Sequence, residues 1–359
     1  MSKSELSPVG HQCLALCEIP SVIGDERALA DFVASRHAAR WPLVRLGNNL
    51  VFGGPTGPDR PLVAFFGHLD TVPGEAHAPR VLEDRLVALG ASDMKAGLAV
   101  MTSLMEAHHP GVGSVDLAFI FYDREEGPFA ENGLGPTLEI VNWKHSITLG
   151  FCLEPSANRL QYGCLGTLHA RLTFVGRRAH SARPWEGENA IHKAGPLLAA
   201  LQVQTPRRVD LGGLGYREVM SITVAEGGKA RNVIPERFVA NLNYRFAPGK
   251  TLAVAEAEVL SLVAGAAEIE FIDRSPSGTV PPPHPFLDIL TGPLGLVPEP
   301  KQAWTDVARL SQWGIPAVNL GPGEPSQAHQ AGEWVPWRHL DEGLALFQAF
   351  LEAVGARAD

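Results

Sequence analysis

The sequence predicts an α/β fold in which a mostly parallel sheet is sandwiched by helices and a smaller α+β domain is inserted. Short apolar runs alternate with helical stretches in residues 1–165, and period-two alternation replaces them in residues 166–276. The first pattern returns afterwards, so residues 277–359 are expected to rejoin the first domain. The length of 359 residues favours two domains of ordinary size.

The first domain is expected to contain buried strands separated by a helix. Residues 62–66 (LVAFF) and 116–122 (DLAFIFY) are apolar runs of strand length, and another covers 147–153. Residues 94–108 carry apolar side chains at helical spacing. Histidine or acidic residues follow each strand. Because binding sites in open α/β sheets gather at the carboxyl ends of the strands, we expect a polar site there.

The inserted domain is expected to be an antiparallel sheet covered by helices. Residues 168–175 (LHARLTFV) alternate between apolar and polar side chains, which indicates a half-exposed antiparallel strand. Three more strand-like stretches cover residues 219–225, 238–246 and 268–272. Helical segments lie between these stretches, so the pattern predicts about four strands and two helices.

The C-terminal part is expected to complete the first domain. Five prolines in residues 275–285 exclude regular structure in that segment. Beyond it we expect a helix over 304–313, a strand over 316–320 and a closing helix over 339–354.

Charge and cysteine content exclude several classes of protein. The 30 Lys and Arg residues against 39 Asp and Glu give a net charge of −9, which offers no basic surface to nucleic acid. The four cysteines match no disulfide framework or zinc ribbon, so we expect reduced, mostly buried thiols. Residues 1–12 lack the apolar core of a signal peptide, and no apolar run is long enough to span a membrane. We therefore expect a cytoplasmic protein that binds neither nucleic acid nor membranes.

Two motifs in the first domain carry residues typical of metal sites. The segment GHLDTVPG places His68 and Asp70 on the same face of an extended chain. The imidazole of His68 could then bind a metal while the carboxylate of Asp70 orients that imidazole. The segment ASDMKAG places Asp93 at the start of the predicted helix, where Asp93 or Ser92 is more simply explained as a helix N-cap.

Three further motifs place acidic or histidine side chains at strand or loop ends. The segment DREEGP supplies Glu125 and Glu126, CLEPS supplies Glu154, and GPGEPSQAHQAGEWV supplies His329. Adjacent glutamates on a loop are usually only solvated. Because neighbouring side chains diverge, however, one glutamate could bind a metal while the other acts as a base. Two histidines and three carboxylates without a thiolate suit a pair of zinc ions that share one carboxylate.

The ordered motifs GHLDTVPG, ASDMKAG, DREEGP, LEPS and AHQAGE resemble the M20 family of di-zinc aminoacylases and deacylases. The resemblance covers nearly the whole chain, since RAHSARPWEGENAIHKA and NVIPERF are similar to the dimerisation domain of that family. It implies a homodimer through the inserted domain. Within the family, these segments and WTDVARLSQWGIPAVNLGPGEP are most similar to actinobacterial enzymes that remove succinate from N-succinyl-diaminopimelate.

The resemblance implies two zinc ions per chain, which cobalt or manganese could replace because sites of nitrogen and oxygen ligands accept several divalent ions. The implied ligands are Asp93 as the bridge, His68 and Glu154 on one ion, and Glu126 and His329 on the other.

The same resemblance implies roles for five other residues. Asp70 would orient His68, Glu125 would be the general base, and His180 would reach into the partner subunit's active site. Asn232 and Arg245 would help to hold the carboxylates of a small anionic N-acyl amino acid. Without the resemblance, His180 is more simply a turn cap and Arg245 a surface arginine on a strand.

Three functions remain open at this point. The first is removal of succinate from N-succinyl-LL-2,6-diaminopimelate in lysine and diaminopimelate biosynthesis. The second is hydrolysis of N-acetylornithine, another N-acyl amino acid or a dipeptide, because residues 162–166 (YGCLG) lack the basic loop that many desuccinylases carry there. The third is metal binding without catalysis, which would not require the second carboxylate of Glu125.

Overall fold

The computed structural model describes residues 6–74 and 78–358 and divides into two compact units, each described here by itself. Unit 1 holds the described residues up to Gly163, Val280–Pro300 and those from Thr305 onward, and unit 2 holds Cys164–Thr279 and Lys301–Trp304. The sequence placed the boundaries at 165/166 and 276/277, with residues 301–304 in the first domain. The first five residues of the segment inspected for a signal peptide lie outside the described residues.

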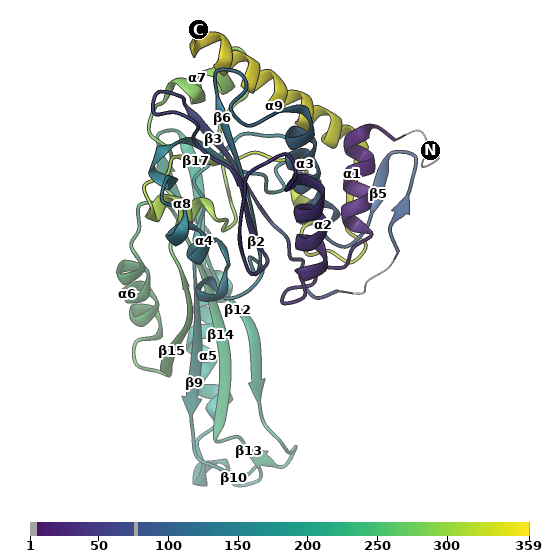
Figure 1. Cartoon of the computed structure of the whole chain (residues 1–359). Coiled ribbons are helices and arrows are strands. Elements are labelled where there is room, and N and C mark those ends of the chain that lie inside the picture. The colour runs from purple at the N-terminus through teal and green to yellow at the C-terminus, as the bar shows by residue number, and fades with distance from the viewer. Residues whose placement is uncertain (1–5, 75–77, 359) are drawn as a thin grey trace. The chain divides into compact units, whose positions relative to one another are not determined.

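Unit 1 is built around an eight-stranded mixed sheet (Figure 1). In spatial order its strands are β1 (Leu43–Leu46), β2 (Asn49–Gly53), β6 (Asp116–Tyr122), β3 (Leu62–His68), β7 (Ile147–Cys152), β17 (Ala317–Asn319), β8 (Gln161–Tyr162) and β16 (Glu299–Pro300). The four central strands, β6, β3, β7 and β17, run parallel to one another. Their carboxyl ends therefore meet at one edge of the sheet.

Helices cover both faces of this sheet. They are α1 (Pro8–Cys17), α2 (Arg27–His37), α3 (Ala96–Ala107), α4 (Leu134–Ile140), α7 (Pro285–Thr291), α8 (Val307–Gln312) and α9 (Trp337–Ala358). Phe65 in β3 points toward α9, where its ring lies 5.4 Å from that of Phe347. Its neighbours Ala64 and Phe66 point the opposite way and are also fully buried. Burial on both faces explains why β3 is a continuous apolar run, and it confirms the predicted α/β sandwich.

A small sheet adjoins the loops of unit 1. It consists of β18 (Trp334–Pro336), β5 (Arg85–Val87) and β4 (Arg80–Val81), paired antiparallel in that order. In the part of the chain that the structure describes, no helix has the length and apolar character needed to cross a membrane.

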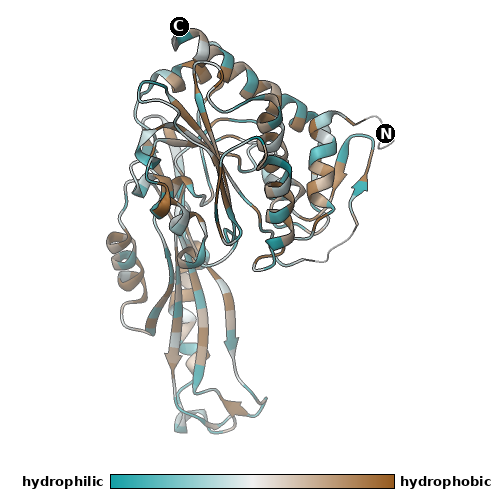
Figure 2. Ribbon diagram, in the orientation of Figure 1, coloured by the Kyte–Doolittle hydropathy of each residue, from teal (hydrophilic) through white to brown (hydrophobic). Residues whose placement is uncertain are grey.

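Unit 2 is an antiparallel sheet covered by two helices. Its strands, in spatial order, are β11 (Arg207–Leu211), β12 (Leu214–Gly227), β14 (Arg237–Phe246), β9 (Gly166–Val175) and β15 (Glu268–Ser275). Helices α5 (Ala190–Val203) and α6 (Leu252–Val263) pack their buried side chains on it. A separate two-stranded antiparallel sheet pairs β10 (Ala179–His180) with β13 (Val233–Ile234). Along β14 buried and less buried residues alternate. Figure 2 shows bands of hydrophobic and hydrophilic residues along the long strands of this sheet.

Three elements differ from the sequence predictions. The sheet of unit 2 has a fifth strand, β11, which the sequence analysis missed. The helix expected over 94–108 begins only at Ala96, because Asp93 and Met94 have non-helical backbone angles. The helix expected over 304–313 covers only α8, because Trp304 belongs to unit 2 and its indole N–H donates to the carbonyl of Pro276.

Candidate metal centre

The carboxyl ends of β3, β6 and β7 bring together side chains that are far apart in the sequence. His68 is the last residue of β3 and lies opposite Tyr122, the last residue of β6, in the parallel pair. Glu125 and Glu126 follow β6, and Glu154 follows β7. The predicted gathering of polar side chains at this edge is therefore present.

Asp93 reaches the same place from an irregular helical turn over Ala91–Lys95. Its backbone angles, φ −118° and ψ 93°, are not helical, and the peptide bond to Met94 is cis. The N-cap interpretation is wrong, because Lys95 occupies the N-cap position of α3. Ser92 does not cap α3 either, since its hydroxyl donates to the carbonyl of Trp334.

Two groups of potential ligands share Asp93. Nitrogen and oxygen atoms of His68, Asp93 and Glu154 lie within 4.8 Å of one another, and so do those of Asp93, Glu126 and His329. The Oδ1 atom of Asp93 lies 3.2 Å from Nε2 of His68, and Oδ2 lies 3.6 Å from Nε2 of His329. The two oxygens of Asp93 thus face two different histidines, which is the arrangement that a carboxylate bridging two cations requires.

Glu125 belongs to neither of these groups. It lies within the same 4.8 Å limit of His68 and Glu126 in a third group, beside the pair that shares Asp93. Its carboxylate is therefore close to both potential metal sites without being needed to complete either.

Asp70 organises the loop that carries both glutamates. Its Oδ1 and Oδ2 atoms accept hydrogen bonds from the backbone N–H groups of Glu125, at 3.0 Å, and Glu126, at 2.9 Å. The Nδ1 atom of His68 lies 3.0 Å from the carbonyl oxygen of Asp70 and 3.5 Å from its carboxylate. Asp70 therefore touches the histidine through both its backbone and its side chain.

The acidic side chains raise one another's pKa. Burial raises the pKa of Glu125 well above its usual value, and Glu154 and Glu126 raise it further against the lowering effect of His68. Burial also raises the pKa of Glu126, although a hydrogen bond from His329 lowers it. The same hydrogen bond raises the pKa of His329 to about 9. Several carboxylates thus share two imidazoles, and such a cluster of acids is a favourable environment for divalent cations.

Glu333 is a buried acid to which the sequence analysis assigned no role. It is only 2% exposed, and it accepts three backbone hydrogen bonds, from Gly90 at 2.7 Å, Ser92 at 2.7 Å and Asp93 at 2.8 Å. It thereby ties the segment that presents His329 to the turn that presents Asp93. The motif AHQAGE contains Glu333, but the hydrogen-bond partners of Glu333 are backbone N–H groups. Such partners cannot be recognised from the side chains in a sequence.

The remaining predicted site residues lie in unit 2. His180 in β10 is exposed and accepts a hydrogen bond from the N–H of Ala182, and the carbonyl of the exposed Asn232 accepts one from Ser181. The antiparallel pairing of β10 with β13 thus brings His180 and Asn232 together. Arg245 lies near the opposite end of β14 and donates to the side chain of Asn243 at 3.1 Å.

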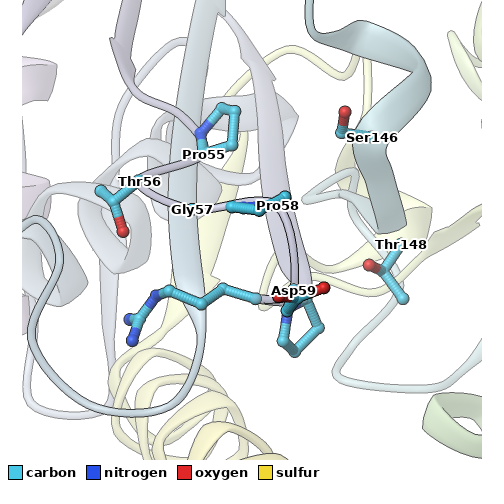
Figure 3. Close-up of a pocket in the computed structure, with 9 residues that line it drawn as sticks. Pro55, Thr56, Gly57, Pro58, Asp59, Ser146 and Thr148 are labelled. Carbon is cyan, nitrogen blue, oxygen red and sulfur yellow. The ribbon is translucent and has the colours of Figure 1, made fainter.

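A cavity of about 750 Å³ lies at the other edge of the sheet in unit 1 (Figure 3). Its walls are residues 55–61 together with Ser146 and Thr148, at the amino ends of β3 and β7. These walls contain none of the predicted site residues, so size alone does not identify the functional site of this protein.

Comparisons with known proteins agree with this geometry. The sequence model of the family described as Peptidase family M20/M25/M40 matches residues 64–353. A Mycobacterium tuberculosis protein with the provisional name succinyl-diaminopimelate desuccinylase is 38% identical over 94% of this chain and 96% of its own length. A Corynebacterium glutamicum succinyl-diaminopimelate desuccinylase is 34% identical over 94% of each chain.

Solved structures share the fold. A Staphylococcus aureus tripeptidase superposes with a TM-score of 0.79 at 20% identity, covering 97% of this chain and 98% of its own. A Bacillus subtilis protein described as a dinuclear metal-binding peptidase superposes with a TM-score of 0.66 at 17% identity, covering 96% and 97%.

Proposed function

The chain belongs to peptidase family M20/M25/M40 and is an amide hydrolase of that family, and we propose that it removes succinate from N-succinyl-LL-2,6-diaminopimelate with two zinc ions. The observation that supports this most is the sharing of Asp93 between two ligand groups, each completed by one histidine and one glutamate. The relatives named as desuccinylases support the substrate, which belongs to lysine and diaminopimelate biosynthesis.

The residues at the site fit a pair of divalent cations. His68, Asp93 and Glu154 would hold one ion, and Asp93, Glu126 and His329 the other. These are imidazole and carboxylate donors, which zinc accepts and which cobalt or manganese would also accept. Bound there, such a pair would lower the pKa of a water toward about 7 and would polarise an amide carbonyl.

Glu125 is proposed as the general base. Its carboxylate takes the proton of the water whose oxygen attacks the amide carbon. It then donates that proton to the amide nitrogen as the carbon–nitrogen bond breaks, which releases succinate and the free amine. Burial raises the pKa of Glu125, which makes its carboxylate a stronger base toward the water than an exposed glutamate would be.

Asp70 is proposed to keep this geometry in place. By accepting the N–H groups of Glu125 and Glu126, it holds the base and a metal ligand at fixed positions relative to each other. Its contact with Nδ1 of His68 would leave Nε2 of that ring as the atom available to a metal.

The substrate is tested by a turnover panel with purified, zinc-loaded enzyme. N-succinyl-diaminopimelate should be hydrolysed fastest among N-succinyl-diaminopimelate, N-acetylornithine, other N-acyl amino acids and dipeptides. Faster hydrolysis of N-acetylornithine would assign the chain to another activity of the same family. Binding of zinc without hydrolysis of any amide would instead support the non-catalytic alternative.

We also propose that the enzyme is a homodimer formed through unit 2. Eight of the fourteen exposed large hydrophobic side chains among the described residues lie in unit 2, although it is the smaller unit. Trp185, 75% exposed, is close in sequence to His180, which is proposed to act in the partner subunit's active site.

The role of His180 is tested with the variant His180→Ala. Its turnover should fall about 10²- to 10³-fold, as when one donor to the developing oxyanion is removed, and it should remain dimeric in solution. Full activity of this variant would exclude the role.

A cytoplasmic location is proposed as well. None of the four cysteines forms a disulfide and all four are buried, as expected for a protein of a reducing compartment.

A further inference from the structure

A second cavity in unit 1, of about 690 Å³, adjoins the candidate metal centre. Its walls include His329, a proposed metal ligand, and Glu333, which holds the turn of Asp93. The volume lies within the range of small-molecule sites. Because one wall is shared with the metal centre, a molecule in this cavity lies beside the amide that the proposed reaction cleaves.

The walls combine apolar side chains with a single fixed positive charge. Val72 and Pro73, which follow β3, and Val87 and Leu89, which end and follow β5, provide the apolar surface. Arg80 in β4 is the one lysine or arginine among the described residues that line the cavity. Such walls fit a short aliphatic arm that ends in an anion.

Arg80 differs from the neighbouring Arg85 in its contacts with the described residues. Arg85, on the paired strand β5, donates to Asp84 at 2.6 Å and lies 4.3 Å from the centre of the Trp334 ring. Among the described residues, Arg80 has no comparable partner and is exposed. Glu333, the acid in the cavity wall, already accepts three backbone hydrogen bonds and does not pair with Arg80.

An anionic substrate needs a cation of this kind. The metal centre is lined by carboxylates, and residues 162–166 (YGCLG) supply no arginine. A guanidinium provides paired N–H donors that match the two oxygens of a carboxylate. Resting on the function proposed above, we propose that this cavity binds a carboxylate-terminated arm of the substrate and that Arg80 pairs with that carboxylate.

Two parts of the proposed substrate share this chemistry. One is the distal carboxylate of the succinyl group, and the other is a carboxylate of the diaminopimelate part. The succinyl carboxylate ends a chain of two methylene groups, and the far carboxylate of diaminopimelate is on an amino-bearing carbon that follows three methylene groups. In either case the methylene groups would lie along Val72 and Leu89.

The test compares wild-type enzyme with Arg80→Gln on three amides. N-succinyl-diaminopimelate has both kinds of carboxylate, N-acetyl-diaminopimelate lacks that of the acyl group, and N-succinyl-pentylamine lacks those of the amino acid. For the first amide, kcat/KM should fall about 10- to 150-fold, mainly through KM, as expected for a lost charge-assisted hydrogen bond. If the acyl carboxylate is the partner, the fall disappears with the N-acetyl compound. If the amino-acid carboxylate is the partner, it disappears with the pentylamine.

Three variants make the result specific. Arg85→Gln removes a neighbouring arginine that does not line the cavity and should leave all three kcat/KM values near those of wild type. Arg80→Lys should recover part of the loss, because it restores charge without the paired donors. Arg80→Met repeats the neutral substitution if the glutamine variant unfolds at a lower temperature than wild type.

The inference is overturned if Arg80→Gln and Arg80→Met change kcat/KM no more than Arg85→Gln does, or change it equally for all three amides. Failure of the proposed function gives a different result, namely that wild-type enzyme prefers another amide. In that case the same variants are compared on the preferred amide with and without its carboxylate, and the same two outcomes decide the role of Arg80.

Discussion

The acidic side chains at the two edges of the parallel sheet in unit 1 have different partners. At the amino edge, Asp116 begins β6 and is 1% exposed, and its carboxylate accepts hydrogen bonds from the backbone and hydroxyl of Thr56 and from Arg60. At the carboxyl edge, Glu125 and Glu126 lie beside other carboxylates. At the amino edge one acid is paired with an arginine, whereas at the carboxyl edge several acids share the imidazoles of His68 and His329.

The pKa shifts have opposite signs for this reason. Burial by itself raises the pKa of Asp116, but the hydrogen bonds from Thr56 and Arg60 outweigh it and leave the pKa below its usual value. At Glu125 burial is reinforced by neighbouring acids, and the pKa rises. The cavity at the amino edge (Figure 3) is lined by Thr56 and Arg60, the partners of the acid whose pKa is lowered. The proposed metal centre lies at the other edge, where the pKa of the acids is raised.

Removing metal should have the largest effect and act at the carboxyl edge alone. Treatment with a strong chelator followed by dialysis should abolish turnover, and zinc should restore it. The temperature of unfolding should fall at the same time, because a ligand that binds only the native state stabilises it by about 2.7 kcal/mol at a hundred times its Kd. Activity, metal content and thermal unfolding are measured on the same samples. Full turnover by metal-free protein would contradict the proposal.

Glu125→Gln should separate the base from the ligands. Turnover should fall about 10²- to 10⁴-fold, the usual contribution of a general base, while two zinc ions per chain remain bound. Metal content by elemental analysis and kcat are the two measurements. Glu131→Gln is the control, because Glu131 follows β6 as well but is exposed and paired with Arg124. Loss of zinc from the Glu125 variant would show that this residue is a ligand.

The sequence predicted the helices and strands in which the pattern of apolar and polar residues follows the pattern of buried and exposed side chains. Strands β3 and β6 are buried on both faces, so their apolar runs marked their bounds to within two residues. The strand β11 escaped detection because its residues, RRVDL, are all partly or fully exposed and include three charged side chains. The sequence placed Trp304 at the start of a helix. In the structure it lies outside that helix, and its indole N–H donates to the carbonyl of Pro276, which is distant in sequence.

The same distinction applies to the site. Motif spacing and strand ends indicated the residues that the fold gathers around Asp93, since their side chains point toward one centre. Glu333 went unassigned because its function depends on backbone N–H groups of residues 90–93, which are far away in the sequence. A role for Arg80 could likewise not be predicted from the sequence, because it depends on the cavity that this residue lines.

Glu333→Gln should loosen the metal centre without removing a ligand. The amide group offers one acceptor oxygen where the carboxylate has two, so the turn carrying Asp93 loses part of its support. Zinc affinity should fall about 10- to 100-fold, as is common for residues that orient metal ligands. Competition with a chromophoric chelator measures the affinity, and the visible spectrum of cobalt-substituted protein reports the ligand geometry.

Glu324→Gln is the matched control for Glu333. Glu324 lies in the same segment, but among the described residues its carboxylate accepts hydrogen bonds from Ser326 alone. Zinc affinity and cobalt spectra identical to wild type in the Glu333 variant would show that the three hydrogen bonds do not support the centre.

Asp116→Asn tests the amino edge and should leave zinc binding and turnover unchanged. Because the pKa of Asp116 is lower in the folded than in the unfolded protein, its stabilising effect is present above the unfolded pKa of about 3.9 and is lost as pH falls through the folded pKa. At pH 7 the variant should therefore unfold with about 1 to 3 kcal/mol less free energy than wild type, and the difference should shrink at lower pH. Urea unfolding at both pH values measures it, with the exposed Asp59→Asn as a control. A difference that stays constant with pH would mean that the negative charge of Asp116 is not what stabilises this edge, and the contrast between the two edges would lose its electrostatic basis.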